Sequence, residues 1–158
     1  MPRRGAPGHS LPHVPVPEDV ELTFPDDGGC FGCSPSNRDG LQLRFRRLGE
    51  RVVARCTIAN RFHGAPGLAH GGIVATLLDE VSCAVMALVA EHRVMTGELT
   101  VRYERPCPVE APLDLAVAIV DRSHARYWIV EAEIHHAGTR VARSHGKFFL
   151  RGTEPAAP

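Results

Sequence analysis

The sequence has no excess of charge of either sign. Lys plus Arg and Asp plus Glu each number 18, so the formal net charge is zero. A protein that binds nucleic acid or an anionic membrane surface mainly through charge carries a basic excess. We therefore expect neither of these as the main partner of the chain.

The sequence also lacks a long apolar run that is free of charge. Its longest apolar segment, residues 73–90, contains Asp79 and Glu80. Each acid would cost on the order of a few kcal/mol inside a bilayer, so we expect a buried helix here and no membrane span. Residues 1–8 are rich in proline and glycine and have no apolar core, unlike a signal peptide. These features predict a cytoplasmic protein.

The sequence has few cysteines, and their number, five, is odd. An odd number speaks against a disulfide framework. Cys30 and Cys33 have C-x-x-C spacing, but zinc normally takes four ligands and no second pair follows. No βαβ pattern favours a thioredoxin-like redox motif, and His135 and His136 point to opposite faces of a predicted strand. We predict no metal and no cofactor.

The length of 158 residues and the apolar content of 44% suit one domain with a substantial core. Five prolines and no sustained apolar period predict a flexible arm over residues 1–20. The single domain is expected over 21–151. Residues 152–158 carry no pattern and are predicted to be a disordered tail.

The hydrophobic periodicity predicts one long helix and five or six strands. Apolar and polar residues alternate around Gly49-Glu50, which predicts a β-hairpin. An antiparallel sheet that curls around one helix is the simplest way to cover a helix that is apolar on nearly every side. The predicted fold class is therefore α+β, with a single long central helix. The predicted strands are 41–47, 52–58, 96–104, 113–121, 127–135 and 140–150, and the helix is 73–90.

The segment with the most chemical information is 70–80, His-Gly-Gly-Ile-Val-Ala-Thr-Leu-Leu-Asp-Glu. Gly71-Gly72 begins the apolar helix, and its first N–H groups have no carbonyl partner inside the helix, so they can receive a negatively charged oxygen. Asp79 lies about 12 Å farther along the axis, too far for one carbonyl group to contact both. Two antiparallel copies of the helix can bring Gly71 of one chain to Asp79 of the other. If the segment is catalytic, this geometry predicts a homodimer with shared sites.

These residues resemble the hotdog-fold acyl-CoA thioesterases, in the branch that includes the phenylacetate-pathway thioesterases and the mammalian thioesterase superfamily members. The likeness covers roughly residues 28–150 and implies a hotdog fold. It rests on the loop 63–72, the acid-bearing turn 75–80, the strand segment 95–106, Cys30-x-x-Cys33 and residues 37–41.

The resemblance implies a role for each matching residue. Asp79 would be the general base or nucleophile, Gly71 the oxyanion-binding amide and Thr96 the hydroxyl that orients water. His70 would shape the turn and face the thioester. Glu80 is expected to be a solvated or interface charge.

One position departs from the resemblance, because Gly64 stands where some relatives carry Asn. His63 beside it is a candidate substitute in substrate binding. The further substrate-binding candidates are Gly72, Gly97, Arg102 and Arg105. The guanidinium groups of the two arginines suit the phosphates of coenzyme A, although exposed charges at strand ends are as common.

The implied function is hydrolysis of an acyl-CoA by a homodimer, and hotdog relatives often pair two dimers into a tetramer. Two alternatives stay open. One is a non-hydrolytic acyl-CoA binding module, and the other is a hotdog dehydratase or hydratase that uses His63 and Asp79 as a pair. The residues also have structural interpretations: Asp79 as a capping acid, Thr96 as an ordinary strand residue, and His70 as a local polar contact.

Overall fold

The structure, a computed structural model, describes residues 28–152. The predicted arm 1–20, the first residues of the predicted domain and all but residue 152 of the predicted tail lie outside this range. The elements, in chain order, are β1 (Phe45–Leu48), β2 (Arg51–Thr57), the 3-10 helix η1 (Asn60–Phe62), α1 (Gly71–Leu88), β3 (Val94–Tyr103), β4 (Pro112–Asp121), β5 (Tyr127–His136) and β6 (Thr139–Leu150).

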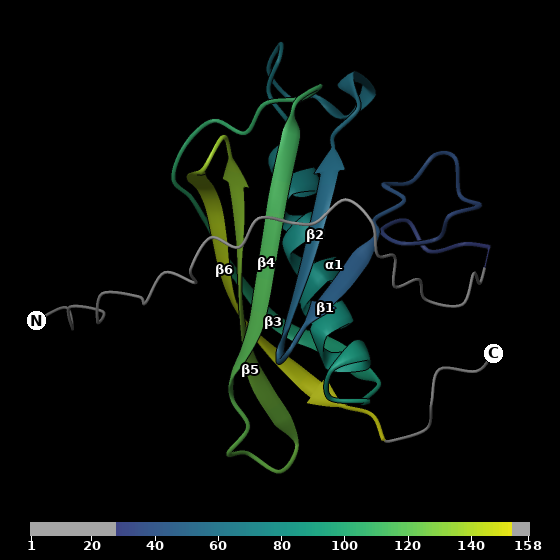
Figure 1. Cartoon of the computed structure of the whole chain (residues 1–158), viewed down its shortest axis with the longest axis vertical. Coiled ribbons are helices and arrows are strands. Elements are labelled where there is room, and N and C mark those ends of the chain that lie inside the picture. The colour runs from purple at the N-terminus through teal and green to yellow at the C-terminus, as the bar shows by residue number, and fades with distance from the viewer. Residues whose placement is uncertain (1–27, 153–158) are drawn as a thin grey trace, which may run out of the picture.

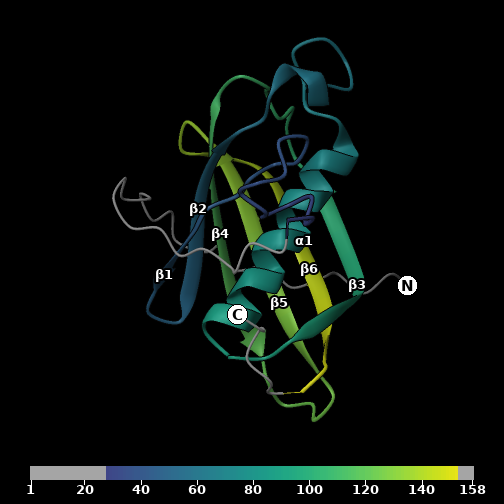
Figure 2. The same cartoon turned by 90° about the vertical axis from the view of Figure 1, so that its right-hand side faces the viewer.

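The six strands form one antiparallel sheet in the order β1-β2-β4-β5-β6-β3. The helix α1 lies against one face of this sheet (Figures 1 and 2) and contacts every strand. Strands β1 and β3 are the two edge strands of the sheet, and β3 runs beside the helix. This arrangement confirms the predicted α+β fold with one central helix, and the strand number is six.

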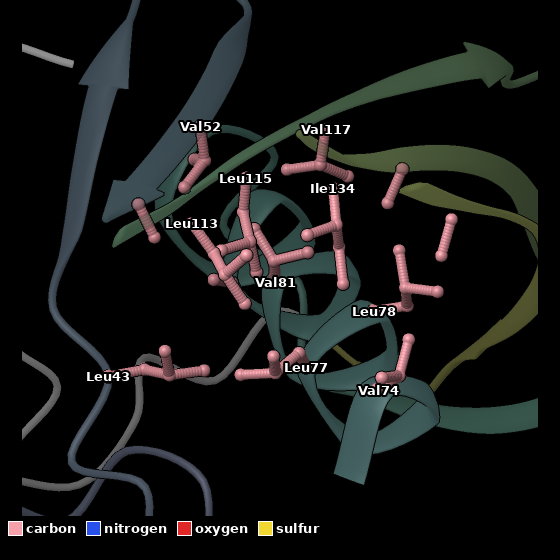
Figure 3. Close-up of a cluster of buried hydrophobic side chains, with 14 of the residues drawn as sticks. Leu43, Val52, Val74, Leu77, Leu78, Val81, Leu113, Leu115, Val117 and Ile134 are labelled. Carbon is pink, nitrogen blue, oxygen red and sulfur yellow. The ribbon is translucent and has the colours of Figure 1, made fainter. Parts of the chain in front are cut away.

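The core lies between α1 and the sheet (Figure 3). On β4, Leu113, Leu115 and Val117 are two residues apart, so all three point to the same face, toward the helix, and are at most 1% exposed. Full burial of such a side chain stabilises the fold by about 1.5–3 kcal/mol. The apolar helix residues that are fully or almost fully buried are Val74, Leu77, Leu78, Val81, Ala84, Val85 and Met86.

By length and composition, α1 is also a candidate membrane span, with a mean hydropathy of 1.6. In this fold its apolar side chains pack against the sheet, and 44% of the helix is buried. The helix therefore has the packing of a core helix, as the two acids in its sequence predicted.

The predicted hairpin forms around Gly49-Glu50, with Leu48 opposite Arg51. The prediction that its first strand starts at residue 41 is wrong, because β1 starts at Phe45. The N–H groups of Leu41 and Leu43 donate instead to Phe31 O at 2.7 Å and Gly32 O at 2.8 Å. The backbone there pairs with the loop that carries Cys30 and Cys33.

The sheet covers only one side of α1. On the other side, Thr76, Asp79, Glu80 and Cys83 are half-buried. One antiparallel sheet cannot enclose a helix completely, so one face of α1 stays open for polar groups.

Candidate active site

The start of α1 is built by His70, which caps the helix. The helix begins at Gly71, within the Gly71-Gly72 pair that the sequence predicted as its start, because His70 is extended and its Nδ1 accepts a hydrogen bond from Gly72 N at 3.0 Å. An accepting Nδ1 carries no proton. The Gly72 amide is thus engaged, whereas the Gly71 N–H has no hydrogen-bond partner within residues 28–152. Gly71 is therefore the amide that this turn presents to an incoming oxygen.

Tyr103, at the end of β3, holds this turn from the side. Its hydroxyl donates to Gly71 O at 2.8 Å. A hollow of about 410 Å³ lies beside the contact and is lined by Gly71, Val74, Tyr103, Arg105 and residues of β6, among others. The sequence analysis did not single out Tyr103. Its position at the end of the strand that carries Thr96 was the available signal.

Asp79 and Thr96 meet on the open side of α1. The Thr96 hydroxyl donates to Asp79 Oδ1 at 2.7 Å, and both residues are half-buried. A hydrogen bond from a neutral hydroxyl to a carboxylate is charge-assisted and fixes the carboxylate in one orientation. The structure thus brings together the predicted acid and the predicted hydroxyl.

Gly97 explains why Thr96 points to the helix. The pairing of β3 with β6 shifts between Thr96 and Glu98, so Gly97 is the extra residue of a β-bulge. The bulge reverses the alternation and places Thr96 on the same side as Leu99. A Cβ at Gly97 would overlap the ring of Phe149. Gly97 therefore has a structural role, and its predicted contact with substrate stays a prediction.

Cys83 is the third member of this group, and the sequence analysis missed it. It lies one helical turn after Asp79, and its Sγ is 3.8 Å from Thr96 Oγ1. Burial, and to a lesser extent the charge of Asp79, raise the pKa of the Cys83 thiol to about 12. The thiol therefore stays protonated at neutral pH and is not a nucleophile there.

The predicted site residues thus form two separate groups within one chain. Asp79 and Thr96 lie at the middle of α1, whereas His70 and Gly71 lie at its start, with Tyr103. Eight residues of helix separate Gly71 from Asp79, which corresponds to roughly 12 Å. The described chain does not bring these two residues to one point.

The remaining predicted residues lie near the start of α1 or on the loop before it. His63 Nδ1 donates a hydrogen bond to Asn60 O at 2.6 Å, so the His63 ring stabilises its own loop. Asp79 is hydrogen-bonded to Thr96 instead. This speaks against a His63 and Asp79 pair within one chain. Arg105 lines the hollow and donates to Arg140 O at 2.9 Å, and Arg102 is exposed on β3. Their contacts with coenzyme A stay predictions.

Glu80 has a polar contact with a loop that is distant from it in sequence. Its side chain is half-buried, and Oε1 accepts a hydrogen bond from Cys30 Sγ at 3.5 Å. The Glu80 side chain is therefore not fully solvated, and its role as an interface charge stays a prediction. A helix places residues 79 and 80 about 100° apart, so Asp79 can face β3 while Glu80 faces the loop with Cys30 and Cys33.

The chain is similar to known thioesterases. Residues 66–143 match the family model of the thioesterase superfamily. Acyl-coenzyme A thioesterase THEM4 from Rattus norvegicus is 31% identical over 77 residues, which are 49% of this chain and 30% of that protein. The matched segment is therefore less than a third of this curated relative.

The fold is also similar to solved structures of thioesterases. A thioesterase superfamily protein is 29% identical with a TM-score of 0.67, over 73% of this chain and 57% of that chain. A hypothetical thioesterase protein from Streptococcus pneumoniae TIGR4, solved with coenzyme A, is 21% identical with a TM-score of 0.63, over 70% of this chain and 89% of that chain. The second likeness concerns the fold alone. Together these matches confirm the hotdog fold and the thioesterase resemblance.

Proposed function

We propose that the protein hydrolyses the thioester of an acyl-CoA to a free acid and coenzyme A, because residues 66–143 match the family model of the thioesterase superfamily. The observation that carries the proposal is the Thr96 to Asp79 hydrogen bond on the open face of α1. The name of the rat relative and the coenzyme A in the Streptococcus structure support this class of substrate.

In the proposed reaction, Thr96 occupies Asp79 Oδ1, which leaves Oδ2 for chemistry. By one route, Oδ2 takes a proton from water while the water oxygen attacks the carbonyl carbon. The carbon–sulfur bond then breaks, and coenzyme A leaves as the thiol with that proton. By the other route, the carboxylate itself attacks the carbonyl carbon, the carbon–sulfur bond breaks and coenzyme A leaves as the thiolate. Water then cleaves the resulting anhydride to the free acid and the Asp79 carboxylate, and a proton from that water neutralises the thiolate. In both routes the Gly71 N–H stabilises the negative carbonyl oxygen.

We further propose that the active protein is a homodimer in which Gly71 of one chain serves Asp79 of the other. The separation of roughly 12 Å along α1 supports this arrangement, because one carbonyl group cannot contact both residues. The exposure of the edge strand also supports it. Strand β3 lies at an edge of the sheet, with Met95 51% and Tyr103 54% exposed, and the free backbone groups of an edge strand can pair with a second copy of the chain.

The proposal is tested by release of free coenzyme A from a panel of aliphatic and aromatic acyl-CoAs. We expect turnover of at least one substrate, and a loss of about 10² or more in Asp79→Asn. Asp79→Asn keeps the size of the side chain and still accepts from Thr96, so the variant should fold. The oligomeric state of both proteins is measured alongside as the control.

A wild-type protein that binds acyl-CoA without releasing coenzyme A would overturn hydrolysis and favour the binding module. Hydration or dehydration of an acyl-CoA, with the thioester intact, would favour the dehydratase or hydratase instead.

A further inference from the structure

A cluster of three metal-binding side chains lies apart from the group around Asp79. Cys30, Cys33 and Glu80 are all half-buried, and their donor atoms lie within 4.8 Å of one another. The two Sγ atoms are 3.2 Å apart, and Glu80 Oε1 is 3.5 Å from Cys30 Sγ. We propose that these three residues bind a zinc ion.

The donor set suits zinc, which takes thiolate sulfur and carboxylate oxygen in tetrahedral geometry. From bond lengths of about 2.3 Å to sulfur and about 2.1 Å to oxygen, a sulfur and an oxygen ligand lie about 3.6 Å apart. The observed 3.5 Å between Cys30 and Glu80 already has this value. Two sulfur ligands lie about 3.8 Å apart, so the thiols need to separate by about half an ångström.

The loop is shaped for the three groups before any ion binds. Cys33 N donates a hydrogen bond to Cys30 Sγ at 3.3 Å, which holds the Cys30 sulfur within the turn. Ser34 N donates to Cys30 O at 3.2 Å and closes the turn. A Cβ at Gly32 would overlap the carboxylate of Glu80, so only glycine lets Glu80 reach the cysteines.

An ion at this position ties the loop to the central helix. Cys30 and Glu80 are 50 residues apart in sequence, and Glu80 is the neighbour of Asp79 on α1. Three protein ligands leave a fourth position, which water fills in the simplest case. Because the ion joins distant segments, its binding stabilises the folded chain and raises the melting temperature.

The test is zinc uptake by the full-length chain, reduced with a phosphine that does not bind zinc. We expect an equimolar amount of tightly bound zinc and a higher melting temperature. With cobalt in place of zinc, thiolate ligation gives charge-transfer absorption in the near ultraviolet. Cys30→Ser, Cys33→Ser and Glu80→Gln should each weaken binding by about 100-fold or more.

Two matched variants serve as controls. Asp79→Asn removes the adjacent carboxylate of the same helix, and Cys56→Ala removes a cysteine elsewhere, so neither should change zinc affinity. If the three ligand variants bind zinc as the wild type does, the proposal is wrong. If a cysteine variant does not fold, wild-type cobalt protein without thiolate absorption would still overturn it.

The same cysteines also allow another outcome. If the reduced chain takes up no zinc while oxidation links Cys30 to Cys33, the pair is a redox site and the zinc proposal fails. None of these measurements depends on thioester hydrolysis, so the zinc proposal and the proposed function are tested separately.

Discussion

The two faces of α1 belong to one helix, yet they differ in almost every physical respect. On the face toward the sheet, Val74, Leu78 and Val81 are at most 1% exposed and belong to the apolar core. On the opposite face, Asp79 and Cys83 are half-buried and make polar contacts with Thr96. The face toward the sheet stabilises the fold, and the opposite face carries the polar groups of the proposed active site. Variants that act on one face and spare the other test this division.

The largest effect is expected on the buried face. Leu78 is fully buried between α1 and the sheet, so Leu78→Ala leaves a cavity and should lower the free energy of unfolding by about 2–5 kcal/mol. Thr76→Ala, on the opposite face, is the matched control and should change it by about 0.5 kcal/mol or less. Urea denaturation of both variants measures the difference. Equal losses would contradict the division of the helix into two faces.

The next effect concerns the start of the helix. Gly71 is the first helical residue, a position that proline tolerates, and His70 before it is already extended, with ψ 136°. Gly71→Pro therefore removes the N–H that is proposed to bind the oxyanion while the helix start is kept. We expect kcat/KM to fall by about 10²–10³. Gly71→Ala keeps the N–H, and its Cβ would lie 3.5 Å from the Tyr103 hydroxyl, an ordinary contact, so it should retain most activity.

The same variant tests whether two chains share a site. Gly71→Pro and Asp79→Asn are each inactive as homodimers if both residues are essential. After unfolding and refolding together, half of the dimers are mixed and hold one intact site of two, so about a quarter of wild-type activity should return. No recovery, with mixed dimers present, would show that each site lies within one chain.

Most of the buried face was predictable from the sequence, because the apolar period of α1 and the alternation of β4 follow from local spacing alone. Asp79 and Thr96 were predicted through the resemblance. Cys83 and Tyr103 were missed, since their roles depend on the bulge at Gly97 and on the packing of β3 beside α1. No local sequence pattern predicts the bulge or the packing of these two elements.

The errors have a common physical cause, which is competition between distant segments. Strand β1 starts late because Leu41 and Leu43 pair with the loop at Phe31 and Gly32. That loop also contacts Glu80, for which the sequence predicted a solvated or interface charge and no hydrogen bond with Cys30. Periodicity describes each segment separately and cannot rank two possible partners for one backbone.

A smaller effect is expected from the hydroxyl beside the acid. Thr96→Val has nearly the same shape but cannot donate to Asp79 Oδ1, so the carboxylate loses its fixed orientation. We expect kcat to fall by about tenfold, which corresponds to one hydrogen bond to a charged group. Thr96→Ser restores the hydroxyl and should recover most of the loss. A serine variant as slow as the valine variant would mean that the methyl group of Thr96 matters and the hydrogen bond does not.

The smallest effect should come from Tyr103, which connects the two groups only indirectly. Its hydroxyl holds Gly71 O, at the end of the same strand that carries Thr96. Tyr103→Phe removes this hydrogen bond at an exposed position, so the free energy of unfolding should fall by about 1 kcal/mol or less. Because the Gly71 N–H is then positioned less well for the oxyanion, kcat/KM should fall by a few-fold, with unchanged zinc uptake at Cys30 and Cys33. A loss as large as that of Gly71→Pro would instead make the phenol itself part of the reaction, and the start of α1 would then act through a side chain as well as through its backbone.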